Sequence, residues 1–163
     1  MKTSTQIVGS ASVPQNSVRS VARSDRALDF VALTKPRLNL LVLLTTVAGL
    51  YLASPNGVAL ALAAHTLIGT ALVAGGAAAL NQVWERETDR RMRPTSGRPL
   101  PRGRLGVAEG TWFGVLLAIV GIVELALGAT VAAAAVAAGT LISYVLVYTP
   151  LKTRTSLATI VGA

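Results

Sequence analysis

The chain has 163 residues, of which only 13% are charged and 52% are hydrophobic. Soluble domains carry roughly 25% charged residues, and the mean hydropathy of +0.59 is correspondingly high. These values exclude a disordered chain and favour an integral membrane protein. The sequence has no cysteine and one histidine. Disulfides, thiolate metal sites and cysteine nucleophiles are therefore excluded, and a histidine metal cluster has too few ligands.

Residues 1–28 form a polar leader in which no acidic residue precedes Asp25. The leader lacks the apolar core that a secretory signal needs. Its composition favours a flexible cytoplasmic tail. A mitochondrial transit peptide, which is also basic, serine-rich and poor in acids, is the alternative.

Four apolar stretches follow the leader, each close to the ~20 residues that cross a bilayer as a helix. Since lipid offers no partner for backbone groups, each stretch is predicted to be a transmembrane helix. The predicted spans are Leu38–Ala53, Gly57–Leu80, Thr111–Leu127 and Gly128–Tyr148. Pro36 precedes the first at a position typical of a first helical turn, and Thr149-Pro150 is expected to end the fourth.

A fifth apolar stretch opens at Ser156 and reaches Ala163, about 12 Å of helix. We therefore expect the sequence to be the N-terminal part of a longer protein. The fold class expected is all-α, a polytopic bundle with four full spans and the start of a fifth.

The fifteen basic residues all fall on one side of this predicted topology, although a net charge of +8 alone would suggest a nucleic-acid partner. They lie before the first span, between the second and third, and after the fourth. The connections at 54–56 and around Gly128 carry none. Because basic residues mark the cytoplasmic side of a membrane protein, we expect lipid rather than nucleic acid as the partner. The Ala-, Gly- and Val-rich spans favour a bacterial inner (plasma) membrane. The N-terminus and the Asn81–Gly110 loop would be cytoplasmic, or matrix-facing in a mitochondrial inner membrane.

The segment NQVWERETD at the start of that loop places Asn81, Glu85 and Asp89 four residues apart. On a helix each such step adds about 40° of rotation and 6 Å of rise, so the three side chains share one face. An amide oxygen and two carboxylates are hard oxygen ligands suited to Mg²⁺. The alternative is that Glu85 and Asp89 only pair with neighbouring arginines on a solvated helix surface.

A basic run follows these acids and would supply cations for the phosphates that Mg²⁺ binds. Carboxylates for a metal beside arginines for an anion indicate a diphosphate site. The arginines predicted to contact the diphosphate are Arg98 and Arg102 first, then Arg90 and Arg93.

Four segments over residues 29–163 resemble the UbiA superfamily of intramembrane prenyltransferases, whose first signature is Asn-x-x-x-Asp/Glu-x-x-x-Asp. Three of these segments are LTKPRLNLLVLLTTVAGLYL, NQVWERETDRRM with the RPLPRGRL that follows it, and YVLVYTPLKTRTSLATIVGA. The fourth is the Ala/Gly-rich second span, which fits more loosely. The runs RPLPRG and YTPLKTRT favour the branch that farnesylates haem. The resemblance implies a nine-span family fold, of which residues 29–163 would be the N-terminal part.

The resemblance also implies an activity and its participants. A farnesyl group would move from farnesyl diphosphate to a vinyl group of haem B, giving haem O and diphosphate, with Mg²⁺ held by Asn81, Glu85 and Asp89. Tyr148 and Lys152 match a second superfamily pattern, in which Lys152 would contact the diphosphate and Tyr148 would donate a hydrogen bond or shield the allylic cation. A downstream haem A synthase is an implied partner. The fragment alone is expected to be inactive.

Several features keep a second interpretation. Small residues over 71–79 would either leave room for the farnesyl chain or allow close helix packing, as is common in membranes. His65 would be a haem ligand or a polar residue near the outer end of its span, and Glu124 receives no role. The whole chain would otherwise be a UbiA-type transferase acting on an aromatic or quinone precursor, or a membrane fragment without catalysis.

Overall fold

The computed structural model describes residues 25–152, which form helices joined by turns and one longer loop. A short helix, Asp25–Leu33, is followed by α2 (Pro36–Leu52), α3 (Leu60–Arg91), α4 (Val107–Gly128) and α5 (Val131–Ile142). A π-helical segment, η1 (Ser143–Tyr148), and α6 (Thr149–Lys152) continue the line of α5. The all-α prediction is confirmed. The fifth apolar stretch lies outside the described residues.

Three helices are long and apolar enough to cross a membrane: α3, α4 and the continuous helix Val131–Lys152. The pair Asp25–Leu33 and Pro36–Leu52 gives a fourth span if it crosses as one element bent by 47°. Pro36 occupies the start of α2, as expected. Residues 25–28, which the sequence analysis assigned to the polar leader, form the first turn of the short helix.

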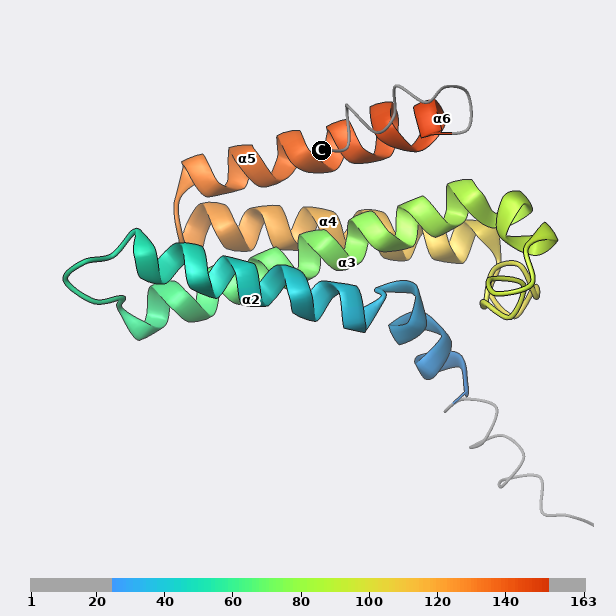
Figure 1. The fold of residues 1–163 in the computed structure, drawn as a ribbon, viewed down its shortest axis with the longest axis horizontal. Coiled ribbons are helices and arrows are strands. Elements are labelled where there is room, and N and C mark those ends of the chain that lie inside the picture. Colours follow the sequence, from blue (N-terminus) through green and yellow to red (C-terminus); the bar gives the residue numbers. More distant parts are fainter. Residues whose placement is uncertain (1–24, 153–163) are drawn as a thin grey trace, which may run out of the picture.

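The helices form a bundle in which α3 and α4 lie along each other and α2 and α5 flank them (Figure 1). Glycines allow α3 and α4 to approach closely. A Cβ atom on Gly76 would lie 2.7 Å from the carbonyl oxygen of Gly114, and one on Gly121 would lie 2.8 Å from that of Gly69. Backbone contact of this kind is a common way for membrane helices to associate.

The expectation that Thr149-Pro150 ends the fourth helix is wrong. Proline lacks an N–H and its ring would collide with the carbonyl four residues earlier in a regular α-helix. Here the preceding turns widen into η1, and the N–H of Thr149 bonds to the carbonyl of Tyr144, five residues back. The hydroxyl oxygen of Thr149 lies 2.8 Å from the same carbonyl oxygen. The wider turn lets the helix continue as far as Lys152.

The loop between α3 and α4 and the short helix Asp25–Leu33 pack together at one end of the bundle. Leu33, Ala79, Leu100 and Leu105 form a buried cluster there. Gln82, which is 1% exposed, donates through Nε2 to the carbonyl of Leu33 at 2.8 Å. Nε of Arg104 donates to the carboxylate of Asp29 at 3.0 Å. These contacts fix the polar end of α3 against its neighbours.

Candidate active site

A polar cavity of about 500 Å³ lies at this end of the bundle, where α3 continues beyond its apolar part. Asn81, Glu85 and Asp89 all line it, so the predicted shared face of the helix is observed. Asn81 and Asp89 are 3% and 5% exposed, which is unusual for polar side chains at a helix end. The sequence spacing therefore places two buried groups, Asn81 and Asp89, and the partly buried carboxylate of Glu85 around one cavity.

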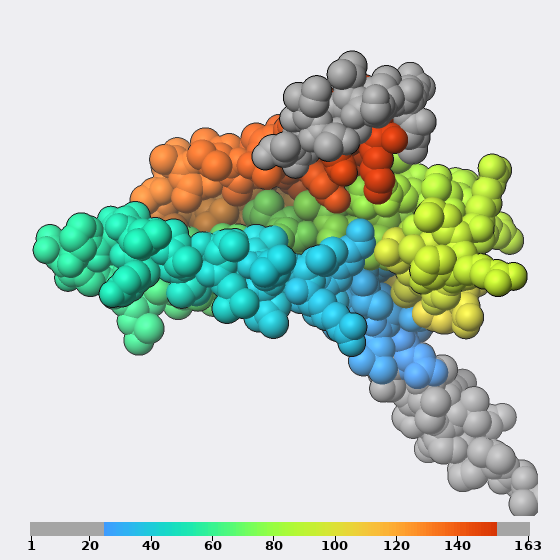
Figure 2. Space-filling model, viewed as in Figure 1, coloured from blue at the N-terminus to red at the C-terminus, as the bar shows by residue number. Residues whose placement is uncertain are grey.

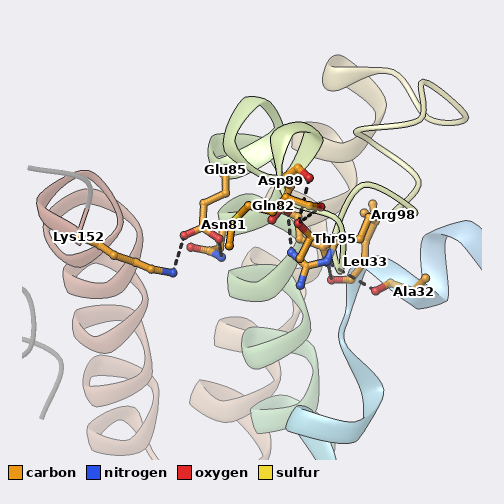
Figure 3. Close-up of polar contacts among 10 residues, drawn as sticks. Ala32, Leu33, Asn81, Gln82, Glu85, Asp89, Thr95, Arg98 and Lys152 are labelled. Carbon is orange, nitrogen blue, oxygen red and sulfur yellow. Dashed lines mark hydrogen bonds and ion pairs between the residues drawn. The ribbon is translucent and has the colours of Figure 1, made fainter.

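Asn81 and Glu85 are tied to the last turn of the neighbouring helix (Figure 3). The amide nitrogen of Asn81 donates to Oε2 of Glu85 at 2.9 Å, and its oxygen accepts from the hydroxyl of Thr149 at 3.0 Å. Nζ of Lys152 donates to Oε1 of Glu85 at 3.0 Å. A single network thus joins α3 to α6 across the cavity.

Asp89 is held from the loop that follows α3. A guanidinium nitrogen of Arg98 lies 2.6 Å from Oδ2 of Asp89, and the hydroxyl of Thr95 donates to the Asp89 carbonyl at 2.9 Å. These contacts bring a predicted diphosphate contact, Arg98, to the cavity wall (Figure 3).

The partners of the two carboxylates differ from those of a solvated helix surface. In the described structure, Glu85 and Asp89 form no ion pair with the arginines of α3, and Arg86 instead pairs with Glu87 at 3.3 Å. Their partners come from α6 and from the loop. Charged pairs whose members come from separate elements and line a cavity are candidates for a ligand-binding site.

Two tyrosines from η1 complete the wall. The rings of Tyr144 and Tyr148 stack with centroids 5.4 Å apart and an interplanar angle of 16°. Both line the polar cavity together with Lys152, at steps of four residues. Two aromatic rings from η1 and the ammonium group of Lys152 from α6 therefore line the same space.

An apolar groove of about 690 Å³ adjoins the polar cavity. Its walls are α2, α3 and the α5–η1 helix, and α3 is visible between the other two in Figure 2. Lys35, Thr140 and Tyr144 line both spaces. The small residues divide between two uses, because Ala74, Ala77 and Ala78 line the groove whereas Gly76 packs on α4.

The donors around the polar cavity fit Mg²⁺ only with help from a ligand. No group of three His, Cys, Asp or Glu side chains within residues 25–152 is close enough to hold a metal alone. Mg²⁺ in phosphate-binding sites typically takes one or two carboxylates, with phosphate and water oxygens completing its shell. Glu85 and Asp89, with the Asn81 oxygen, match that donor set.

The structure assembles six of the nine predicted site residues, and the other three lie elsewhere. Arg90, Arg93 and Arg102 are exposed and do not line the cavity. The sequence analysis missed Lys35, Tyr144 and Thr149. Tyr144 was detectable, since it lies four residues before Tyr148, but the other two depend on tertiary contacts.

His65 lies in the part of α3 that precedes the groove alanines, and it has a protein partner. Its Nδ1 is 2.7 Å from Oε1 of Glu124 on α4. Neither residue lines the cavities described above. The pair accounts for both polar side chains without a haem ligand.

Comparison with known proteins identifies the family of the chain. Residues 42–163 match the model of the UbiA prenyltransferase family. The chain belongs to that family. It is 51% identical over 136 residues to a protein from Myxococcus xanthus named protoheme IX farnesyltransferase, covering 83% of this chain and 46% of that protein. Proteins of the same name from Solibacter usitatus and Anaeromyxobacter are 46% and 47% identical, covering 83% and 84% of this chain and 49% and 46% of those proteins.

The chain thus spans about half the length of the curated UbiA relatives that it matches. No solved structure matches it.

Proposed function

We propose that the protein is a magnesium-dependent prenyltransferase that moves the farnesyl group of farnesyl diphosphate to a vinyl group of haem B, forming haem O. The observation that carries the proposal is the junction of two spaces of opposite character. A polar cavity lined by Glu85, Asp89, Arg98 and Lys152 opens into an apolar groove. An allylic diphosphate has the same two parts, a multiply charged head and a hydrocarbon tail.

The head would lie in the polar cavity. Arg98 and Lys152 each pair with a carboxylate in the described structure and would turn toward phosphate oxygens when the diphosphate binds. Asn81, Glu85 and Asp89 would hold Mg²⁺ against the same phosphates. Bound Mg²⁺ would stabilise the negative charge that grows on the diphosphate as the allylic C–O bond breaks.

The farnesyl chain would lie in the groove beside the alanines of α3. When its C–O bond breaks, the electron pair stays with the departing diphosphate and an allylic cation is left. Tyr144 lines both spaces and Tyr148 lines the polar cavity, so their rings would stabilise the cation through their π electrons. A new C–C bond would then form to the vinyl group and leave the positive charge on the carbon beside the porphyrin. Water would add to that carbon and lose one proton to the solvent, which gives the hydroxyethylfarnesyl product.

Arg90, Arg93 and Arg102 remain predicted diphosphate contacts. Their exposure outside the cavity makes them suited to attracting the anion toward the site rather than to holding it there. Single substitutions of these residues should therefore lower kcat/KM more strongly at low ionic strength than at high.

The membrane arrangement belongs to the same proposal. The N-terminus and the 81–110 loop would face the cytoplasm of a bacterium, across the plasma membrane, because the basic residues cluster there. The diphosphate would then enter from the aqueous side and the tail from the bilayer. Haem B would be the acceptor, and a downstream haem A synthase would receive the product.

The test is product formation in membranes that contain the protein expressed from its complete gene. Farnesyl diphosphate and haem B are added to these membranes. The haems are then separated by chromatography and identified by mass spectrometry. Haem O should appear with Mg²⁺ and disappear with a chelator. Transfer to an aromatic acid or quinone precursor, with haem unchanged, would instead establish another acceptor within the family. Absence of transfer to every acceptor would reject the catalytic proposal.

A further inference from the structure

Lys35 lies at the boundary between the two spaces of the site. It joins the short helix Asp25–Leu33 to α2 and lines both the polar cavity and the apolar groove. The other two side chains at this boundary, Thr140 and Tyr144, are uncharged. Among the residues that the structure describes, Lys35 is thus the one cation shared by both spaces.

The ammonium of Lys35 differs from the other two cations of the cavity. Lys152 pairs with Glu85 and Arg98 pairs with Asp89. Across residues 25–152, in contrast, no hydrogen bond or ion pair engages the Lys35 side chain. A partly buried ammonium without a hydrogen-bond partner has lost hydration with no hydrogen bond in return, so an anionic ligand would relieve that cost.

The backbone holds Lys35 in an unusual conformation. Its φ of 48° and ψ of 63° are left-handed, and Lys35 is the one non-glycine residue with positive φ in the described chain. Side-chain hydrogen bonds with α3 hold the chain on both sides of Lys35. Gln82 donates to the carbonyl of Leu33, and the amide of Asn39 donates to the carbonyl of Ala71 at 2.9 Å. A left-handed conformation is strained for a residue with a side chain, and such strain clusters at functional sites.

The charges around Lys35 are those of the proposed diphosphate site. Burial lowers the pKa of Lys35, and the positive charge of Arg98 lowers it further, while the carboxylates of Glu85 and Asp89 act in the opposite direction. Lys35 lines the same cavity as the groups that would hold the metal and the phosphates, Glu85, Asp89 and Arg98.

We propose that Lys35 donates a hydrogen bond to the bridging oxygen of the allylic diphosphate, the atom that leaves the prenyl carbon. This inference rests on the proposed prenyl transfer. The bridging oxygen joins the hydrocarbon tail to the charged head, so it must lie where the groove meets the polar cavity. When the C–O bond breaks, its electron pair remains on that oxygen. The ammonium keeps its proton and strengthens its hydrogen bond as negative charge accumulates.

The test replaces Lys35 in the whole protein and measures kcat and KM separately. A donor aimed at developing charge contributes about 10²–10³-fold to kcat, so Lys35→Gln should lower kcat about 100-fold. KM for the allylic diphosphate should change less than threefold, because the contact strengthens mainly in the transition state. Lys35→Arg should recover part of the loss.

Arg37→Gln is the matched control. Arg37 is a neighbouring basic residue that is exposed and lines neither space, and its loss should leave kcat unchanged. Lys35→Gly checks folding, since glycine adopts the left-handed conformation without strain. This variant should accumulate and melt like the unsubstituted protein yet lose turnover as Lys35→Gln does.

Three results would overturn the role of Lys35 while leaving the proposed function intact. These are a Lys35→Gln variant that keeps more than a third of kcat, one that changes only KM for the diphosphate, and one that changes only KM for the acceptor. The last would mean that the ammonium binds an acidic group of the acceptor. An unsubstituted protein that transfers no prenyl group would refute both proposals together.

Discussion

The two ends of α3 both carry polar side chains that bond across helices, yet they differ in what those bonds surround. Near its start, His65 bonds to Glu124 of α4 outside the two cavities. Near its end, Asn81, Glu85 and Asp89 bond to α6 and to the loop around a polar cavity of about 500 Å³.

The difference shows that a polar pair inside an apolar helix is insufficient evidence for a site. The His65–Glu124 pair joins two helices and lines neither of the two cavities described above. At the other end, the paired groups line a space in which cations outnumber carboxylates. Within residues 25–152, no hydrogen bond or ion pair engages the Lys35 side chain. An excess of positive charge over a cavity favours an anionic ligand, whereas a closed pair favours helix association.

The largest effect should come from Asp89→Asn. The substitution removes a buried carboxylate that would ligate Mg²⁺ and leaves Arg98 without its partner. We expect haem O formation to fall at least about 10³-fold, equivalent to ~4 kcal/mol of transition-state stabilisation. The measurement is the initial rate in membranes with matched amounts of protein.

Glu87→Gln is the control for that experiment. Glu87 lies two residues away on the same helix, exposed and paired with Arg86 outside the cavity. The rate of haem O formation by the Glu87→Gln variant should stay within about twofold of that of the unsubstituted protein, because exposed ion pairs contribute little. Equal losses in both variants would mean that charge on this helix, and not a metal site, sets the rate.

The middle of α3 connects the two ends, and Gly76→Ala should test that connection. The new Cβ would lie 2.7 Å from the Gly114 carbonyl oxygen, and backbone atoms cannot move aside cheaply. Overpacking of this kind costs about 1–3 kcal/mol. Thermal unfolding in detergent should show a lower midpoint. Gly49→Ala, where a Cβ meets no atom within 4 Å, should not; a similar drop in both would contradict close α3–α4 packing.

The groove face of α3 should control the length of the prenyl chain. Ala74→Leu fills part of the groove, so use of the 15-carbon donor should fall about tenfold relative to a 10-carbon donor, close to what misfit of a few methylene groups costs. Competition between the two diphosphates measures the ratio. Ala135→Leu, on an exposed face of α5 outside the groove, should leave the ratio unchanged.

Much of this arrangement was predictable, because it depends on spacing within single helices. Asn81, Glu85 and Asp89 must share one face if the helix continues through all three positions. The four-residue spacing of Tyr148 and Lys152 likewise places both side chains on one face of their helix. Lys35 and Thr149 were not predictable, since their importance arises from elements that meet only in the folded bundle. The role of Pro150 was misjudged because the widened turn before it is a tertiary adjustment.

The smallest effect should come from His65→Ala, which removes the pair at the other end of α3. Polar contacts between membrane helices contribute about 0.6 kcal/mol on average, and the half-exposed His65 should contribute no more. We expect a slightly lower unfolding midpoint and an unchanged rate of haem O formation. If His65 instead ligates haem, its loss will weaken haem binding and shift the haem absorption spectrum, while Glu124→Gln, which keeps an acceptor beside the ring, will leave both nearly intact. Such a result would make the two ends of α3 parts of one functional unit, because the His65 end would then bind a ligand as well as join two helices.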